Sequence, residues 1–284
     1  MKPGYGEGGI RGMGSMGRVT DPAEPPRALR VAAFFDVDNT IIRGASSYHI
    51  ARGLREHGFF TRRDMLRFGF EQAKYRLFGE TAEQMDLVNR DAAKFIKGWS
   101  VAEMAAIGEE VWDEVLAHRI YPGTKAIIDE HRAQGHEVWI VSAVPEALGR
   151  LIAAKVGATG ALGTVAVEEN GFLTGEFEGG LLHGPRKGIA VRELAAREGF
   201  DLEASYAYGD SANDESMLDA VGHPCAINPD SKLRRICKER GWPIHEFRKR
   251  RKNGRRGIVR ASITGTVWVV LAVLRSIRKS IFRR

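Results

Sequence analysis

Short apolar runs alternate with amphipathic segments along much of the chain. The run Val31–Phe35 is apolar throughout, and further short runs of mainly apolar residues occur at 137–141, 205–208 and 225–227. Such runs are typical of strands buried on both faces of a parallel sheet. Segments with helical periodicity lie between them, at 124–134, 189–198 and 214–220. This alternation predicts an α/β fold with a Rossmann-like, doubly wound parallel sheet.

The segment between the first two predicted strands is far longer than one crossover helix requires. Its periodicity predicts four amphipathic helices, at 48–56, 63–77, 82–95 and 101–119. We interpret residues 44–120 as a helical cap inserted over the strand ends. Farther along, Asn170-Gly171 stands at the centre of 165–177 and predicts a β-hairpin there.

The two ends of the chain differ from this pattern. Residues 1–29 are rich in Gly, Met, Arg and Pro and show no apolar periodicity, so we expect a disordered leader. They hold no continuous apolar stretch of a secretory signal, which predicts that the protein is not exported. The expected organisation is a core formed by 30–43 and 121–246, the cap, and a tail at 247–284.

Side chains suited to phosphoryl chemistry stand where the predicted strands and helices meet. Asp36 and Asp38 directly follow the first strand, in the stretch Asp36-Val-Asp-Asn-Thr40. Four further polar residues stand at later boundaries: Ser142, Lys187, Asp210 and Asp214. Because ligands of doubly wound sheets bind at the carboxyl ends of the strands, we expect these groups to converge there.

The chemistry of these groups favours phosphate-ester hydrolysis. One carboxylate can attack phosphorus to form an aspartyl-phosphate, and a second can protonate the leaving oxygen and later activate water. A lysine and a hydroxyl can bind the phosphoryl oxygens. Clustered carboxylates are suitable ligands for Mg²⁺.

Each feature taken singly also has a structural explanation. The pattern D-x-D-x-T occurs in solvated acidic turns and calcium loops, Lys187 could be an exposed lysine, and Ser142 or Asp214 could be helix caps. The combination at the expected element boundaries favours the catalytic interpretation.

With these residues in place, the chain resembles the haloacid dehalogenase superfamily, in its phosphoserine-phosphatase-like branch (subfamily IB). The resemblance covers about residues 31–245 and includes the approach Tyr121-Pro-Gly-Thr124 to the second strand. It implies that Asp36 is the nucleophile, Asp38 the general acid and base, and Thr40 a residue that orients the loop. It further implies that Ser142 and Lys187 bind phosphate. The implied Mg²⁺ ligands are Asp36, the Asp38 main-chain carbonyl and Asp210, with Asp214 supporting them.

One position departs from that branch. Phosphoserine phosphatases carry a glutamate nine residues after the nucleophile, where it binds the substrate ammonium, and this chain has Ala45 there. An ammonium buried without a carboxylate partner is costly. The sequence thus predicts a phosphomonoester hydrolase whose substrate is not identified, with phosphoserine phosphatase and a catalytically silent membrane-bound scaffold as alternatives.

Charge is strongly segregated along the chain. The net charge is +7, from 43 basic and 36 acidic residues, but thirteen of the basic residues and no acid lie in 247–284. The remaining 246 residues therefore carry 30 basic and 36 acidic side chains, a net charge of −6. The two cysteines show neither a disulfide framework nor a zinc pattern, which predicts a cytoplasmic protein with reduced thiols.

The tail contains an uncharged stretch, Ala261–Leu274, between basic clusters. As a helix its fourteen residues would span about 21 Å, less than the roughly 30 Å of a hydrocarbon core. Basic clusters are attracted to anionic lipid, so we expect the tail to associate with the cytoplasmic face of a membrane, where the substrate could be a lipid phosphate. One alternative to membrane association is that Ala261–Leu274 forms a helix docked on the folded body. Nucleic-acid binding is a less suitable explanation, because the uncharged apolar stretch of the tail makes no favourable contacts with nucleic-acid phosphates.

Overall fold

The computed structural model describes residues 30–56 and 96–248. The leader, the helices predicted at 63–77 and 82–95, and the tail beyond residue 248 lie outside the described residues. The sequence predictions about those segments therefore stay predictions.

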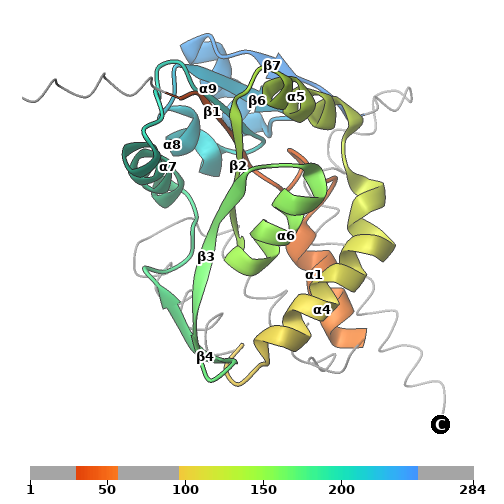
Figure 1. The fold of residues 1–284 in the computed structure, drawn as a ribbon. Coiled ribbons are helices and arrows are strands. Elements are labelled where there is room, and N and C mark those ends of the chain that lie inside the picture. Colours follow the sequence, from red (N-terminus) through yellow and green to blue (C-terminus); the bar gives the residue numbers. More distant parts are fainter. Residues whose placement is uncertain (1–29, 57–95, 249–284) are drawn as a thin grey trace, which may run out of the picture.

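A seven-stranded sheet forms the centre of the described structure (Figure 1). The strand order is β4-β3-β2-β1-β5-β6-β7, and every neighbouring pair is parallel except β3 and β4. The strands are β1 (Ala32–Phe35), β2 (Glu137–Pro145), β3 (Gly160–Glu169), β4 (Phe172–Glu178), β5 (Tyr206–Gly209), β6 (His223–Ile227) and β7 (Ile244–His245). The predicted doubly wound α/β fold is confirmed, with β1 at the middle of the sheet.

Helices cover both faces of the sheet. The α-helices are α1 (Ser46–Glu56), α4 (Val101–Val111), α5 (Pro122–Ala133), α6 (Glu146–Val156), α7 (Pro185–Glu198), α8 (Glu215–Leu218) and α9 (Ser231–Arg240). Three short turns complete them: η1 (Trp112–Leu116), η2 (Ala117–Arg119) and η3 (Ala212–Asp214). In Figure 1, α7 and α8 lie on the opposite side of the sheet from α5 and α6, and α1 and α4 extend away from it as a pair.

Strand β1 separates two hydrophobic clusters. Ala33 and Phe35 point toward α5 and α6, whereas Ala32 and Phe34 point toward α7, α8 and α9. All four side chains are fully buried, as expected for a central parallel strand. Burying each phenylalanine stabilises the fold by roughly 1.5–3 kcal/mol, so the position of β1 is strongly determined.

The structure corrects several predicted boundaries. Strand β2 does not end before Ser142 but continues to Pro145. The Ser142 hydroxyl accepts a weak bond from the Val144 N–H at 3.4 Å, which accommodates a polar residue inside the strand. Helix α5 begins at Pro122 and ends at Ala133 instead of spanning 124–134, because proline is favoured in a first helical turn.

Two predicted helices are interrupted. The segment 101–119 consists of α4, a π-helical turn and a 3₁₀ turn, and 214–220 contains only the short helix α8 after a 3₁₀ turn. Single π turns occur inside otherwise regular α-helices, and the helical periodicity of 101–119 did not locate this one. The helix predicted at 189–198 starts earlier, at Pro185, and the hairpin predicted at 165–177 is confirmed as β3 and β4.

The chain leaves the sheet for α1 and returns from η2 at neighbouring points. Ile42 and Ile120 form an antiparallel bridge, the Arg43 N–H donates to the Arg119 carbonyl at 2.9 Å, and the Tyr121 N–H donates to the Ile41 carbonyl at 2.9 Å. The two connections to the segment 44–120 are thus joined along their length. In the part of the chain described here, no helix is both long and apolar enough to cross a membrane.

Candidate active site

Asp36 occupies the first position after β1, and its backbone is held by the neighbouring strand. Its N–H donates to the Tyr208 carbonyl at 2.9 Å, which continues the β1–β5 pairing by one residue. The chain then turns, because the N–H groups of Ile41 and Ile42 both donate to the Val37 carbonyl. Asn39 sits in this turn with φ 58°, a left-handed conformation that asparagine tolerates. The side chain of Asp36 is almost fully buried.

Asp38 is connected to the first turn of α1. Its Oδ1 atom accepts hydrogen bonds from the Ser46 N–H at 2.8 Å and the Ser46 hydroxyl at 2.5 Å. Burial raises the pKa of Asp38, while the two bonds from Ser46 act in the opposite direction. A carboxyl whose pKa is raised holds its proton closer to neutral pH, as a general acid requires.

Lys187 lies between two of the predicted carboxylates. It stands in the first turn of α7, and its ammonium donates to Asp36 Oδ1 at 2.5 Å and to Asp214 Oδ1 at 2.7 Å. Only 3% of the residue is exposed. Burial alone lowers the pKa of this lysine, but Asp214 and Asp36 outweigh it, so the pKa lies above its ordinary value and the ammonium stays charged. Lys187 is therefore a fixed positive charge beside Asp36.

Asp214 is held by the loop that follows β5. Its second oxygen, Oδ2, accepts from the N–H groups of Asp210 and Ser211, both at 3.1 Å, and from the Ser211 hydroxyl. The close approach to the strand needs glycine at 209, because a Cβ atom there would lie 2.5 Å from the Asp214 Cβ. Both oxygens of Asp214 thus have protein partners, which suits a supporting role.

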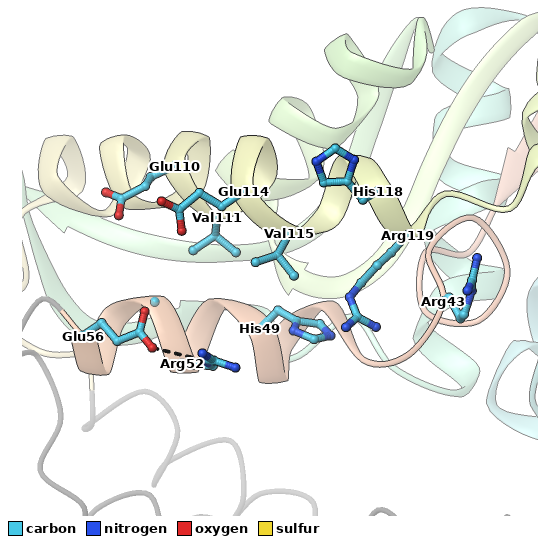
Figure 2. Close-up of a pocket in the computed structure, with 11 residues that line it drawn as sticks. Arg43, His49, Arg52, Glu56, Glu110, Val111, Glu114, Val115, His118 and Arg119 are labelled. Carbon is cyan, nitrogen blue, oxygen red and sulfur yellow. Dashed lines mark hydrogen bonds and ion pairs between the residues drawn. The ribbon is translucent and has the colours of Figure 1, made fainter.

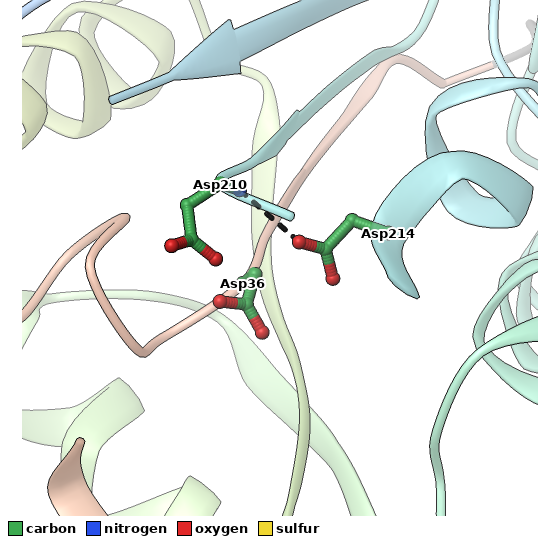
Figure 3. A group of neighbouring side chains, drawn as sticks. All are labelled: Asp36, Asp210 and Asp214. Atoms are coloured by element: carbon green, nitrogen blue, oxygen red, sulfur yellow. Dashed lines mark hydrogen bonds between the residues drawn. The ribbon is translucent and has the colours of Figure 1, made fainter. Parts of the chain in front are cut away.

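Three carboxylates, those of Asp36, Asp210 and Asp214, point toward one another in Figure 3. One oxygen each of Asp36, Asp210 and Asp214 lies within 4.8 Å of the others. Burial, followed by the charges of neighbouring carboxylates, raises the pKa of Asp210 to about 9. Burial likewise raises the pKa of Asp36 to about 7, although Lys187 partly opposes it. The cluster holds more carboxylates than Lys187 can neutralise.

This donor set fits a divalent cation with a preference for oxygen. Buried carboxylates are the ligands that Mg²⁺ takes in proteins, and a cation would relieve the repulsion among them. Within the described residues, the buried hydroxyl of Thr40 also has no hydrogen-bond partner, whereas its carbonyl accepts from the Thr124 hydroxyl. An unsatisfied buried hydroxyl in the turn after β1 is consistent with a site that binds polar groups.

Ser142 lies at the same edge of the sheet, on the strand next to β1. The regular pairing of β2 with β3 is interrupted between Val141 and Pro145, and Ser142 lies inside this irregular stretch. The Thr164 hydroxyl donates to the Ala143 carbonyl at 2.8 Å in place of a ladder bond. The residue is buried, as are Thr40 and Lys187.

Sequence reasoning did not identify three residues of this site, Ser46, Asn228 and Arg248. Asn228 follows β6 and has a φ of 49°. Its side-chain amide donates to the Asn39 carbonyl at 2.9 Å. Its Oδ1 atom accepts from the N–H groups of Phe247 and Arg248. The Arg248 guanidinium lies 3.8 Å from Asp210 Oδ2. Asn228 could have been found, since it ends the fourth predicted strand, but Arg248 could not.

Comparison with known proteins identifies similar chains. Residues 33–219 match the family model described as haloacid dehalogenase-like hydrolase. The chain is 46% identical over 258 residues to phosphoserine phosphatase SerB1 of Mycobacterium tuberculosis (strain ATCC 25618 / H37Rv), covering 90% of this chain and 84% of the relative. It is 39% identical over 223 residues to the inhibition of morphological differentiation protein of Streptomyces azureus, covering 77% and 79%.

A solved structure with a similar fold is that of a protein of unknown function from Bordetella pertussis Tohama I. The TM-score is 0.68 at 29% identity, and the match covers 76% of this chain and 98% of that one. The similarity therefore extends to most of the polypeptide and is not confined to the carboxylate cluster.

Proposed function

The chain belongs to the haloacid dehalogenase-like hydrolase family, in which it is a phosphatase of the phosphoserine-phosphatase-like branch, and from this premise we propose that it hydrolyses phosphate monoesters with Mg²⁺ through a phosphoaspartate on Asp36. The observation that carries the proposal is the pairing of Asp36 with Lys187 at 2.5 Å, at the end of the central strand. A nucleophilic carboxylate beside a fixed ammonium can accept a phosphoryl group, because the positive charge of the ammonium balances the negative charge of the phosphoryl oxygens.

The first step forms the covalent intermediate. An oxygen of Asp36 attacks phosphorus, the bond from phosphorus to the ester oxygen breaks, and Asp38 gives its proton to the departing oxygen. Lys187 stabilises the negative charge on the phosphoryl oxygens, with the Ser142 hydroxyl as a further donor. The bonds from Ser46 keep Asp38 oriented for the transfer.

The second step releases phosphate. Asp38, now ionised, takes a proton from water, and the water oxygen attacks the phosphorus of phosphoaspartate so that the carboxylate of Asp36 is restored. Asp36, Asp210 and the main-chain carbonyl of Asp38 would hold Mg²⁺, with Asp214 and Thr40 supporting the loops around them. When bound, Mg²⁺ supplies positive charge that reduces the repulsion between Asp36 and the incoming phosphate.

The direct test is a screen of soluble and lipid phosphomonoesters with the purified full-length protein. Inorganic phosphate release should require Mg²⁺, and at least one class of ester should be hydrolysed at a rate far above the others. A protein that binds Mg²⁺ but releases phosphate from none of them would support the alternative of a catalytically silent scaffold.

We further propose that residues 44–120 act as a cap that covers the substrate. The joined connections at Arg43 and Arg119 support this proposal, since both ends of the segment meet the core at one place. The Ser46–Asp38 bonds tie the start of α1 to the proposed general acid. A movement of α1 would therefore be coupled to the position of that carboxyl.

Phosphoserine phosphatase is the second candidate, because a relative that is 46% identical carries that name. Against it, residue 45 is an exposed alanine and cannot bind the substrate ammonium. We therefore expect phosphoserine to have a kcat/KM no higher than those of phosphomonoesters without an ammonium group. Ala45→Glu should raise its kcat/KM selectively, and Ala45→Gln is the matched control without charge. If phosphoserine is clearly preferred by the wild type, this interpretation of Ala45 is wrong.

We also propose that residues 247–284 bring the enzyme to the cytoplasmic face of an anionic membrane, where a lipid phosphate could be its substrate. The support is the segregation of charge, with thirteen basic side chains in the tail and a net charge of −6 in the remainder. We expect co-sedimentation with anionic vesicles that weakens at 1 M salt, where the Debye length is about 3 Å. A protein that ends at Glu246 should stay in solution; equal binding by both would refute the proposal.

A further inference from the structure

Arg248 brings a positive charge to the carboxylate cluster in addition to that of Lys187. Its guanidinium lies 3.8 Å from Asp210 Oδ2, whereas Lys187 pairs with Asp36 and Asp214. At 3.8 Å the contact is an ion pair and not a hydrogen bond, so it does not occupy the guanidinium N–H groups. The Arg248 side chain is 47% exposed. The contact with Asp210 therefore leaves these donors accessible to an anion that enters the site.

Asn228 fixes the backbone of Arg248 to the turn after β1. The Oδ1 atom of this buried asparagine accepts from the N–H groups of Phe247 and Arg248 at 2.7 and 3.0 Å. Its amide donates to the carbonyl of Asn39, the residue next to Asp38, at 2.9 Å. One side chain thus joins the segment 247–248 to the turn that carries both proposed catalytic carboxylates.

Packing around Phe247 anchors the same segment. The Phe247 ring stacks on His245, with the ring centres 5.8 Å apart, and packs against the first turn of α5. A Cβ atom on Gly123 would lie 2.4 Å from this ring, so a larger residue there would displace it. One residue earlier, Glu246 pairs with Arg234 of α9. The Arg248 side chain therefore extends from a backbone that is held on several sides.

The hollow of the proposed cap lies elsewhere. It has a volume of about 480 Å³ and lies between α1 and the segment formed by α4, η1 and η2 (Figure 2). The residues that line it all lie between 43 and 119, and Arg248 is not among them. Arg248 approaches the carboxylates from the chain that follows β7. Its effect should therefore not depend on the group esterified to the phosphate.

We propose that Arg248 is a further catalytic residue, which donates to an oxygen of the phosphoryl group, and that Asn228 is its positioning residue. This inference rests on the proposed function. One oxygen each of Asp36 and Asp210 lies within 4.8 Å of the other, so a guanidinium beside Asp210 lies near a phosphoryl group on Asp36. Guanidinium N–H groups form a fixed fork that suits tetrahedral oxoanions.

The charge of the site supports this role. With Asp38 protonated, the three ionised carboxylates of the cluster, the ammonium of Lys187 and a divalent cation sum to zero. Arg248 makes this sum positive before a phosphate dianion enters. Burial and then neighbouring carboxylates raise the pKa of Asp210, while the charge of Arg248 acts in the opposite direction, more strongly than that of Lys187. Arg248 thus attracts the phosphoryl group where Lys187 has less effect.

Arg248→Gln should weaken the binding of inorganic phosphate to the full-length protein by about tenfold at saturating Mg²⁺, as expected for one hydrogen bond to a charged group. Isothermal titration calorimetry measures this affinity without turnover. Arg248→Lys should retain part of the affinity, because it keeps the charge and loses the fork. Arg235→Gln is the matched control, on an exposed arginine of α9 that pairs with Glu239, and it should bind phosphate as the wild type does.

Two further measurements separate a contact with phosphate from support of the metal site. Arg248→Gln should lower kcat/KM by a similar factor for every phosphomonoester that the wild type hydrolyses, because all of them share the phosphoryl group. Its affinity for Mg²⁺ alone should be unchanged or higher, since a positive charge beside Asp210 has been removed. A residue that only supports the metal ligands would instead lose Mg²⁺ affinity when replaced.

The role of Asn228 is tested by a double-mutant cycle. Asn228→Ala should reduce phosphate affinity to about the level of Arg248→Gln, and the double variant should lose little more, because both changes act through one guanidinium. Thermal unfolding checks that Asn228→Ala is folded. Should it not fold, Arg248→Gln changes only a half-exposed side chain and tests the phosphate contact by itself.

The outcomes keep this inference distinct from the proposed function. Equal phosphate affinity in the wild type and Arg248→Gln would overturn the role of Arg248, as would an equal loss in Arg235→Gln or a wild type that does not bind phosphate. A lower Mg²⁺ affinity that accounts for the whole loss would overturn it too. Ester hydrolysis in any of these cases would leave the proposed function intact. Phosphate binding that depends on Arg248 without turnover of any ester would contradict the proposed function and support the contact.

Discussion

Asp36→Asn should lower kcat by roughly 10⁴-fold or more, because the amide cannot attack phosphorus and no other carboxylate follows β1 as directly. The same variant should form no acid-stable phosphoprotein when it is mixed with ³²P-labelled substrate and quenched, whereas the wild type should be labelled. Steady-state phosphate release and the quench experiment measure the two effects independently.

The loss should not come from unfolding. Burial raises the pKa of Asp36 to about 7, so a neutral amide suits this position, and Lys187 keeps its bond to Asp214. The free energy of unfolding of Asp36→Asn should therefore stay close to that of the wild type. Asp113→Asn is the matched control on an exposed helical surface and should retain full activity. Turnover by Asp36→Asn near the wild-type rate would rule Asp36 out as the nucleophile.

Removing Mg²⁺ should abolish activity, and Asp210→Asn should weaken Mg²⁺ binding by at least about tenfold. Isothermal titration calorimetry with Mg²⁺ alone measures the second effect without turnover. Excess chelator should stop the wild type completely, and added Mg²⁺ should restore it. Calcium should substitute poorly, since its coordination is larger and less regular.

The pH dependence of the metal-free protein follows from the raised pKa values. Asp36 and Asp210, at about 7 and about 9, both lie above the ordinary value of 3.8, so folding favours their protonated forms. Their contribution to stability is present below the unfolded-state pKa, near 4, and is lost as the pH rises through about 7 to 9. The melting temperature of the metal-free wild type should therefore fall as the pH rises from the unfolded-state pKa, near 4, to the folded-state values of about 7 and about 9.

Mg²⁺ should reverse this trend, because it binds the ionised carboxylates. Its affinity should rise with pH, protons should be released on binding near pH 7, and 100 Kd of metal should add about 2.7 kcal/mol of stability. In Asp210→Asn, the loss of stability at high pH should be smaller. Stabilisation by Mg²⁺ that is the same in Asp210→Asn and the wild type would show that the metal binds elsewhere.

The predicted site residues came from a simple property of parallel sheets, namely that adjacent strands end at one edge. The apolar run Val31–Phe35 was predicted to be buried on both faces; the structure confirms this burial and shows β1 at the centre of the sheet. Any polar residue that directly follows such a strand must then lie at the carboxyl edge of the sheet. Asp36 and Asp210 follow neighbouring strands, so their proximity was predictable without coordinates.

Tertiary structure alone decided which charges pair and which residues join the site from a distance. Lys187 and Asp214 are 27 residues apart, and their 2.7 Å contact depends on how α7 packs beside the loop after β5. Arg248 reaches Asp210 because Asn228 holds the backbone at 247–248, a three-dimensional relation that no local pattern encodes.

The hollow between α1 and α4 shows the same limit. Helical periodicity predicted both segments from their buried faces, but the sequence does not state at what distance and angle two helices pack. The close approach at Gly53 and Val111 sets that distance, and the bridge between Ile42 and Ile120 brings Arg43 beside Arg119. Burial patterns are encoded locally and were therefore readable in the sequence, whereas the gathering of charges from separate segments depends on packing and was decided by the tertiary structure.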